Sequence, residues 1–139
     1  MKILIINGPN LNLVGKRDPS IYGSEDFSTY LTGLSSELMN DIIDCVQSNH
    51  EGEIVDFLHY NGFGKYDGII INPGAYSHYS YAIADAIGAI DTPVVEIHIS
   101  NIFGRDEFRR TTVTGAQCIG VIAGLGLKGY KLAIEYFRK

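Results

Sequence analysis

Short, nearly continuous runs of apolar residues constrain the fold of this chain more than any other feature of its sequence. The five runs predicted to be strands are residues 3–6, 42–46, 68–72, 93–98 and 119–123. Strands that are apolar on both faces are typical of a parallel sheet buried between two layers of helices. The sequence therefore predicts a central parallel sheet.

Between these runs, apolar residues recur three and four positions apart, which is the spacing of one face of a helix. The segments predicted to be helical are residues 27–38, 48–58, 82–90 and 130–137. Ser48 and Glu51 fit a capping box at the start of the second segment. Because right-handed crossovers place such helices on both faces of a parallel sheet, we predict an α/β, flavodoxin-like three-layer fold. Its five-stranded parallel sheet has the order 2-1-3-4-5.

Size and composition favour a single domain that covers residues 1–139. The chain has 45% hydrophobic and 19% charged residues, which excludes a disordered chain. No apolar run approaches the roughly 20 residues that cross a membrane, and the N-terminal MKILIIN indicates a first strand rather than a secretory signal. Cys45 and Cys118 lie in apolar stretches and are predicted to be buried free thiols, which favours a cytoplasmic protein.

The charged residues are distributed unevenly along the chain. The net charge of −5 disfavours nucleic acid as a partner. Five of the 11 basic residues nevertheless fall in two short segments and are Lys16, Arg17, Arg105, Arg109 and Arg110. Arginines concentrated in the loops of an acidic protein indicate binding of a small anion. The alternative for each of them is a solvated loop charge.

Polar residues follow the predicted strands at one edge of the sheet. In an open parallel sheet, ligands bind beyond the carboxyl ends of the strands, next to the switch in strand order, here between the first and third strands. The polar residues that follow the first, third and fourth strands are Asn7, Asn10, Asn12, Asn72, Ser77, His78, Glu96, His98, Ser100 and Asn101. The loop that carries Tyr22 follows the first strand, and the long connection of residues 99–118 follows the fourth. Both are therefore expected to reach the same edge.

Each of these positions also has a purely structural interpretation. The sequence NGPN at 7–10 could be only a turn, and Asn72 before Pro73 could be only a strand exit. Glu96 and His98 share one face of their strand, as a structural hydrogen-bonded pair would. Tyr22 in isolation is an ordinary loop tyrosine. Their convergence on one predicted edge is what favours a functional site.

Several classes of site are poorly supported. No phosphate-binding glycine motif follows the first strand. The glycine-rich AGLGLKG at 123–129 follows the last strand, where a tight turn and close helix packing explain it better than phosphate binding. No HExxH or CxxC motif indicates a metal site. No lysine follows a strand, where a Schiff base would need it. The remaining possibility is acid–base chemistry on a small polar anion without a cofactor. The titratable candidates for it are His78, Glu96, His98 and Tyr22. The alternative is a non-catalytic flavodoxin-like module that binds a small anion or nucleotide.

Seven motifs give the chain a resemblance to a known family. They are INGPNLN (6–12), RDPSIYG (17–23), QSNHEGEIVD (47–56), IIINPGAYSH (69–78), VEIHISN (95–101), RDEFRR (105–110) and GVIAGLGLKGY (120–130). With these motifs in this order, residues 3–134 closely resemble the type II 3-dehydroquinate dehydratases. The resemblance implies a lyase of the shikimate pathway and of aromatic amino acid biosynthesis that converts 3-dehydroquinate to 3-dehydroshikimate and water. It also implies a flavodoxin-like fold, no metal, cofactor or imine, and a homododecamer built from trimers.

The resemblance further implies roles for individual residues. Tyr22 would remove the proton next to the ketone, and Arg17 would lower the pKa of its hydroxyl. His98, oriented by Glu96, would protonate the leaving hydroxyl, and Asn10 would hold a water that stabilises the enolate. The residues implied to bind substrate are Asn72, His78, the backbone at Ile99 and Ser100, and Arg109. Asp85 would approach the site of a neighbouring subunit.

Overall fold

The computed structural model describes residues 1–16, 19–22 and 24–138, and the side chains of residues 21 and 22 lie outside its described part. Within this part, five parallel strands form one sheet in the order β2-β1-β3-β4-β5. They are β1 (Lys2–Asn7), β2 (Ile42–Gln47), β3 (Gly68–Asn72), β4 (Val94–His98) and β5 (Gly120–Ala123). The predicted sheet and its strand order are confirmed, and the strand ends differ from the prediction by at most one residue.

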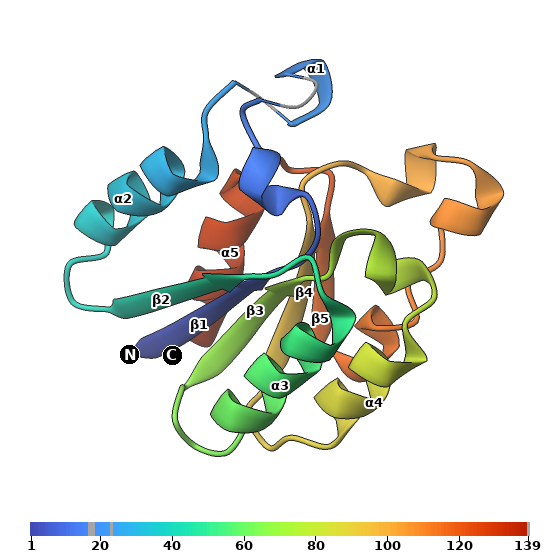
Figure 1. Cartoon of the computed structure of the whole chain (residues 1–139). Helices are drawn as coiled ribbons and strands as arrows, with labels where there is room; N and C mark the ends of the chain where they lie inside the picture. Colours follow the sequence, from blue (N-terminus) through green and yellow to red (C-terminus); the bar gives the residue numbers. More distant parts are fainter. Residues whose placement is uncertain (17–18, 23, 139) are drawn as a thin grey trace.

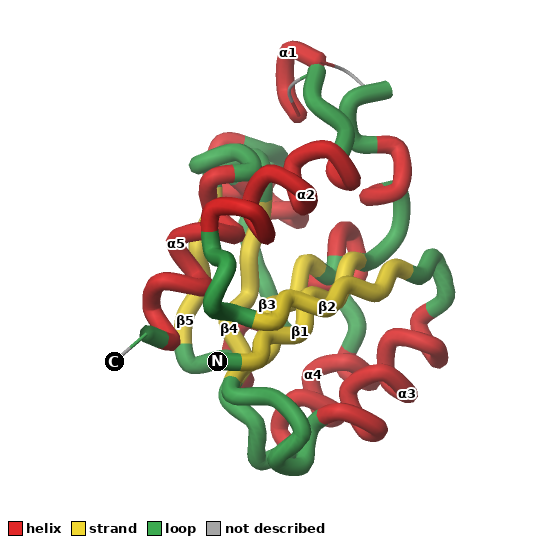
Figure 2. Tube along the Cα trace, turned by 90° about the vertical axis from the view of Figure 1, so that its left-hand side faces the viewer, coloured by secondary structure: helices red, strands yellow, loops and turns green. Residues whose placement is uncertain are grey.

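Two pairs of helices cover the two faces of the sheet (Figures 1 and 2). The pair α2 (Phe27–Glu37) and α5 (Lys128–Phe137) lies on one face, and the pair α3 (Glu51–Asn61) and α4 (Tyr81–Gly88) lies on the other. A shorter helix, α1 (Pro19–Tyr22), precedes them. The predicted three-layer arrangement is therefore confirmed. None of the described helices has the length and apolar character needed to cross a membrane.

The central strands are apolar on both faces because each face meets a different pair of helices. On β1, Ile3 and Ile5 pack with α2 and α5, whereas Leu4 and Ile6 pack with α3 and α4. These four side chains are at most 1% exposed. Successive side chains of a strand point to opposite faces of the sheet. A strand between two helix layers therefore has to be apolar at nearly every position, as the sequence pattern indicated.

The two cysteines belong to the two sides of this core. Both are free thiols, as predicted, and both are partly buried. Cys45 packs against the cluster on the α2–α5 side, and Cys118 packs against the cluster on the α3–α4 side. Burial raises the pKa of the Cys45 thiol to about 11 and raises the pKa of the Cys118 thiol as well. Both thiols are therefore neutral near pH 7, where a thiol is a poor nucleophile.

The start of α3 differs from the prediction, and the predicted capping box is wrong. The residue that precedes the helix is His50, and its side chain makes no capping hydrogen bond. Ser48 lies too early to cap: its hydroxyl accepts a hydrogen bond from the His50 backbone N–H (2.9 Å) and donates to Glu53. Glu51 instead accepts a hydrogen bond from the Ser80 hydroxyl (2.5 Å), which also caps α4 at the Ile83 N–H (3.0 Å). The carboxylate thus ties α3 to α4 rather than closing its own helix.

The long connection between β4 and β5 contains only isolated helical turns, in agreement with its weak periodicity. These are three short 3₁₀ helices, η3 (Ile102–Gly104), η4 (Glu107–Arg109) and η5 (Gly115–Gln117). Figure 1 shows this connection in orange at the end of the sheet where the strands finish, near α1 and the turn after β1. The connection therefore reaches the edge at which the sequence predicted a site.

Gly8 lets the loops after β1 and β3 approach each other closely. Its backbone N–H donates to the Asn72 carbonyl (2.7 Å). A Cβ atom at this position would lie only 2.7 Å from the carbonyl carbon and oxygen of Pro73. Because backbone atoms cannot move aside as a flexible side chain does, this contact requires glycine. The contact brings the turn that carries Asn10 against the end of β3.

We expect Gly8→Ala to lower the free energy of unfolding by roughly 1–3 kcal/mol, because the added methyl group would overpack this contact. Urea denaturation followed by circular dichroism measures the change. The matched control is Gly33→Ala in α2, where a Cβ meets nothing within 4 Å and should stabilise the helix by roughly 0.5–1 kcal/mol. An unchanged or higher stability of Gly8→Ala would contradict the importance of the close approach.

Candidate active site

A pocket of about 170 Å³ lies at the carboxyl edge of the sheet. The predicted site residues that line it are Asn10, Asn72, His98, Ile99, Ser100 and Arg109. They come from three places that are distant in sequence: the turn after β1, the end of β3, and β4 with the connection that follows it. The structure therefore brings together most of the described residues that the sequence assigned to a site.

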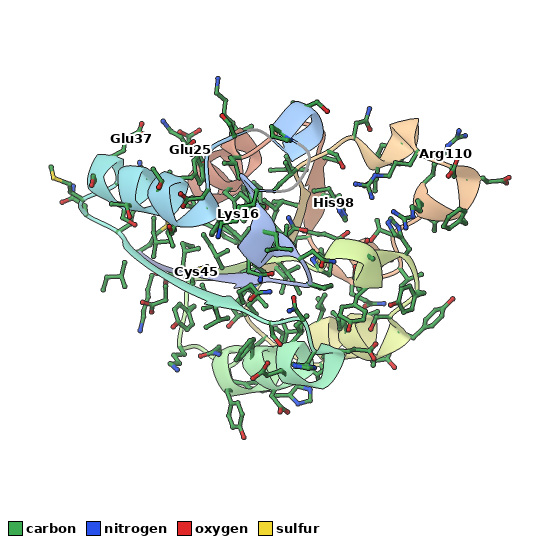
Figure 3. All side chains as sticks on the ribbon, turned by 45° about the horizontal axis from the view of Figure 1, so that its top comes forward. Lys16, Glu25, Glu37, Cys45, His98 and Arg110 are labelled. Carbon is green, nitrogen blue, oxygen red and sulfur yellow. The ribbon has the colours of Figure 1, made fainter. Side chains whose placement is uncertain are left out.

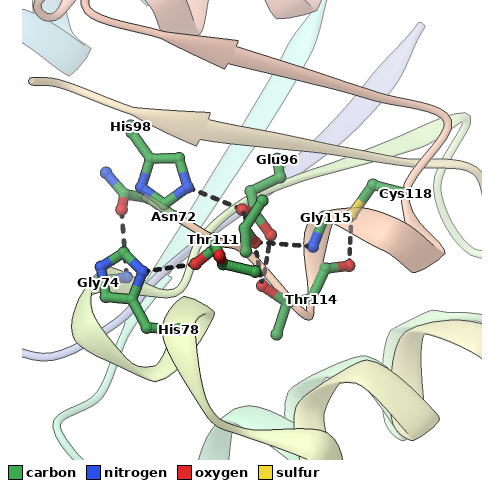
Figure 4. Close-up of polar contacts among 10 residues, drawn as sticks. Asn72, Gly74, His78, Glu96, His98, Thr111, Thr114, Gly115 and Cys118 are labelled. Carbon is green, nitrogen blue, oxygen red and sulfur yellow. Dashed lines mark hydrogen bonds and ion pairs between the residues drawn. The ribbon is translucent and has the colours of Figure 1, made fainter. Parts of the chain in front are cut away.

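Glu96 and His98 form a hydrogen-bonded pair on one face of β4. The His98 Nε2 lies 2.7 Å from the Glu96 Oε1, and because a carboxylate only accepts, the imidazole N–H donates. Glu96 is fully buried, and His98 is 6% exposed. Two further donors reach the carboxylate, the hydroxyls of Thr112 (2.6 Å to Oε1) and Thr114 (2.5 Å to Oε2). Figure 4 shows Glu96 between His98 and Thr114. The buried charge thus has hydrogen bonds on both oxygens, as burial demands.

His78 lies beside His98 at the same edge. The two rings are stacked, with centroids 6.5 Å apart and an angle of 13° between their planes. The His78 Nδ1 lies 2.8 Å from the Thr111 carbonyl oxygen. A carbonyl cannot donate, so Nδ1 carries a proton, and the neutral ring has its acceptor at Nε2. Two histidines with different hydrogen-bond partners therefore meet at the rim.

Asn72 at the pocket wall belongs to a buried hydrogen-bond chain in which sequence reasoning missed Tyr130. The Tyr130 hydroxyl on α5 donates to the Asn7 Oδ1 (2.7 Å) and accepts from the Asn72 Nδ2 (3.2 Å). Tyr130 is fully buried, and burial raises the pKa of its hydroxyl. The neutral phenol joins the ends of β1 and β3 from below. The sequence signal was a hydroxyl-bearing aromatic residue on the buried stripe of the last helix.

Asn10 adopts a backbone conformation that suits asparagine. Its φ angle is 67°, in the left-handed region, which asparagine occupies more readily than most residues. Its backbone N–H donates to the Asn49 Oδ1 (3.1 Å). The turn of residues 7–10 that the sequence suggested is therefore present, and it places Asn10 at the wall of the pocket.

Positive charge reaches the pocket from the long connection. Arg105 and Arg109 both line it, and the Arg105 guanidinium donates a hydrogen bond to the Ser100 hydroxyl. Arg105 was identified only as part of a basic segment and not as a predicted site residue. Arg110 donates instead to the Arg105 carbonyl (2.6 Å) and does not line the pocket. Figure 3 shows Arg110 on the outer part of the connection, away from His98.

Five predicted site residues are not among the described residues that line the pocket. Two of them, Glu96 and His78, lie next to His98, and the other three are Arg17, Tyr22 and Asp85. Arg17 and the side chain of Tyr22 lie outside the described residues, so their roles stay predictions. Asp85 is exposed on α4 and does not line the pocket, and its expected position near a neighbouring subunit is not tested within a single chain. Within the described residues, no group of three or more His, Cys, Asp or Glu side chains could hold a metal ion.

Comparison with known proteins decides the family. The family model described as dehydroquinase class II matches residues 1–138. The chain belongs to the class II dehydroquinases. A 3-dehydroquinate dehydratase of Clostridium perfringens (strain SM101 / Type A) is 52% identical over 141 residues, covering 100% of this chain and 97% of that protein. A 3-dehydroquinate dehydratase of Thermotoga neapolitana is 52% identical over 141 residues, covering 100% of this chain and 95% of that protein.

Solved structures of class II dehydroquinases agree with this assignment. The type II dehydroquinase from Butyrivibrio crossotus has a TM-score of 0.95 and 47% identity, over 100% of this chain and 98% of that chain. The enzyme from Propionibacterium acnes has a TM-score of 0.88 and 38% identity, over 97% and 94%. The predicted family, its fold and its class of enzyme are therefore confirmed.

We expect Tyr130→Phe to lower the free energy of unfolding by roughly 1–3 kcal/mol, because the buried Asn7 Oδ1 and Asn72 Nδ2 both lose their hydrogen bond to the phenol. Thermal unfolding measures this change. The Michaelis constant for substrate should also rise, since Asn72 loses its support. The control is Tyr136→Phe on the same helix, a residue that is 65% exposed, which should change neither quantity. Wild-type stability in Tyr130→Phe would contradict the role of the chain.

Proposed function

We propose that this class II dehydroquinase dehydrates 3-dehydroquinate to 3-dehydroshikimate and water through an enolate intermediate. The observation that carries the proposal is the buried Glu96–His98 pair at the wall of a pocket that two arginines also line. A histidine held by a carboxylate suits proton transfer, and guanidinium groups suit a carboxylate substrate. The reaction places the enzyme in the shikimate pathway.

In this proposal His98 is the acid that protonates the leaving hydroxyl. Hydroxide is a poor leaving group, so a positioned proton donor lowers the barrier. The Nε2 of His98 is bonded to Glu96, and Nδ1 is then the nitrogen that serves the substrate. Glu96 stabilises the imidazolium and holds the ring in place.

The substrate is bound by polar groups around the same pocket. Arg109 pairs with the carboxylate, and Arg105 adds a second guanidinium next to Ser100. The residues that complete binding of the carboxylate and the hydroxyls are Asn72, His78 and the backbone at Ile99 and Ser100. Most of these groups already have protein hydrogen bonds that fix their positions, which reduces the cost of ordering them on binding.

Tyr22 is proposed as the base, and Arg17 as the cation that activates it. A free tyrosine has a pKa of about 10, so little phenolate is present at pH 7. A guanidinium within about 4–6 Å favours the phenolate and lowers this pKa. Asn10 holds a water that donates to the enolate oxygen as charge develops there. No metal, cofactor or imine is required in this scheme.

We further propose that the enzyme is a homododecamer built from trimers, with Asp85 of one subunit close to the pocket of the next. The exposed position of Asp85 on α4 is compatible with such a contact. An assembly of this kind would supply a part of the site that one chain lacks. Analytical ultracentrifugation measures the mass of the assembly.

The test of the reaction is a spectroscopic assay of the wild-type enzyme. We expect the conjugated enone of the product to appear in the ultraviolet when 3-dehydroquinate is added in chelator-treated buffer. Tyr22→Phe should still bind substrate but turn over at least about a hundredfold more slowly, because general-base catalysis contributes that much or more. Tyr60→Phe, an exposed tyrosine of α3, is the control. Binding without product in the wild type would favour a non-catalytic binding module, and a fully active Tyr22→Phe would rule out Tyr22 as the base.

The pH dependence separates the two cations of the loop after β1. The base must be ionised, so the rate rises with pH through the pKa of the Tyr22 hydroxyl. If Arg17 lowers this pKa, Arg17→Ala moves the rise in kcat to higher pH by about one unit or more. Lys16→Ala, at an exposed position, should leave the profile in place. A change in KM alone in Arg17→Ala would make Arg17 a binding residue and not an activator.

A further inference from the structure

We propose that Thr112 and Thr114 are positioning residues of the reaction. Their hydroxyls keep the buried Glu96 carboxylate ionised and immobile, and through it they hold His98 as the proton donor. The inference rests on the proposed function, in which His98 is the acid. It extends the site to a segment of the long connection that was not among the predicted site residues.

The hydrogen-bond directions around Thr112 follow from its partners. The backbone N–H of Gly115 donates to the Thr112 Oγ1 (3.0 Å). The hydroxyl proton is then available for the Glu96 Oε1, 2.6 Å away. The Thr114 Oγ1 lies 2.5 Å from the other carboxylate oxygen and 3.2 Å from the Thr112 Oγ1. An ionised carboxylate can only accept, so both hydroxyls donate to it.

Burial makes these two donors important. Glu96 is fully buried, so solvent does not stabilise its charge. Its donors among the described residues are the His98 Nε2–H and the two threonine hydroxyls. Hydrogen bonds to the charged form of a carboxylate favour that form. Without the hydroxyls, the carboxylate would keep only the His98 N–H as a donor, and it would hold the histidine less firmly.

The same segment also supports the neighbouring histidine. The Thr111 carbonyl accepts from the His78 Nδ1–H (2.8 Å), and the Val113 backbone N–H donates to the Ser77 carbonyl (2.8 Å). Residues 111–114 therefore join the short 3₁₀ helix that follows β3, η2 (Gly74–His78), to Glu96 on β4. One short stretch of chain thus sets the position of both histidines.

Other ionisable groups surround this pair in the described part of the chain. Burial, together with the charge of Glu96, raises the pKa of the Cys118 thiol on the η5 side, and burial raises the pKa of the Tyr130 hydroxyl on α5, so both stay neutral. Arg105 and Arg109 stay cationic. On the neighbouring strands, β5 presents Val121 opposite Glu96 and Ala123 opposite His98, and β3 presents Ile71 opposite Glu96, so none of these neighbours is charged. The ring of His78 stacks on the ring of His98, so His78 must be followed separately.

The experiment compares kcat and KM across pH for Thr112→Val, Thr114→Val and the double variant. Valine keeps the shape of threonine and removes the hydroxyl. We expect kcat of the double variant to fall roughly tenfold with little change in KM. We also expect the double variant to lose kcat on the acid side beyond the fall set by Tyr22, because the charged form of the carboxylate has lost two of its hydrogen bonds. Each single variant should change in the same direction by less.

Matched controls separate lost hydrogen bonds from lost packing. Thr112→Ser and Thr114→Ser keep the hydroxyl and should restore the wild-type profile. Thr92→Val makes the same replacement at another buried threonine, whose hydroxyl has no hydrogen-bond partner among the described residues. It should leave kcat and its pH profile unchanged. A Ser variant that behaves like the Val variant would assign the effect to packing and overturn the proposal.

A measurement without turnover keeps this proposal distinct from the proposed function. Nitrogen-15 NMR of the free enzyme reports the protonation of each imidazole nitrogen of His98 and His78 against pH. We expect the His98 Nε2 to stay protonated at every pH sampled in the wild type, because it donates to Glu96, and any change in protonation to fall on Nδ1. In the valine variants we expect mixed tautomers at His98. Unchanged His98 signals and an unchanged kcat profile in these variants would overturn the proposal. Absence of wild-type turnover would instead refute the proposed function, and the NMR comparison would still decide the role of the threonines.

Discussion

The buried carboxylate of Glu96 is the interaction on which the organisation of this site depends. A charge with no solvent contact has to be surrounded by donors, and here they come from β4 itself and from the long connection that follows it. This requirement determines the course of residues 111–114 across the sheet edge. The connection then reaches the pocket with two arginines, and its Thr111 carbonyl holds the second histidine. One buried charge thus organises an otherwise irregular segment.

A second network supports the opposite wall of the pocket. The close backbone contact at Gly8 and the hydroxyl of Tyr130 both join the end of β1 to the end of β3. These two strands flank the switch in strand order, where the loops of a doubly wound sheet separate and leave a crevice. The groups on this wall are held by hydrogen bonds between neutral partners, whereas β4 and the connection after it line the other wall with His98 and two arginines. The pocket is therefore asymmetric, which suits a substrate with a carboxylate and several hydroxyls.

Much of the architecture could be predicted from local patterns, and the errors also have physical causes. The apolar runs located every strand to within one residue, and strand alternation placed Glu96 and His98 on one face, where they form a hydrogen bond. The capping box was wrong because Ser48 lies two residues before His50, the residue that immediately precedes the helix, and accepts a hydrogen bond from its N–H. Glu51 forms its hydrogen bond with Ser80, which caps a different helix. Thr112, Thr114 and Tyr130 were missed since their partners lie far away in sequence. The apolar stripe of the last helix indicated that Tyr130 is buried but not which groups its hydroxyl meets, and the threonines have no local pattern that distinguishes a buried donor from a surface hydroxyl.

The sequence by itself determined the layers, the strand order and the family. The spacing of apolar residues along the chain shows which faces of each helix and strand must be buried, and it can be read without knowing any long-range contact. Only the tertiary structure decided which hydroxyls serve Glu96, which tautomer His78 adopts and which arginines face the pocket. These choices depend on hydrogen-bond directions and on the exclusion of water at a buried site. Both arise only when segments from β1, β3, β4 and α5 are packed together.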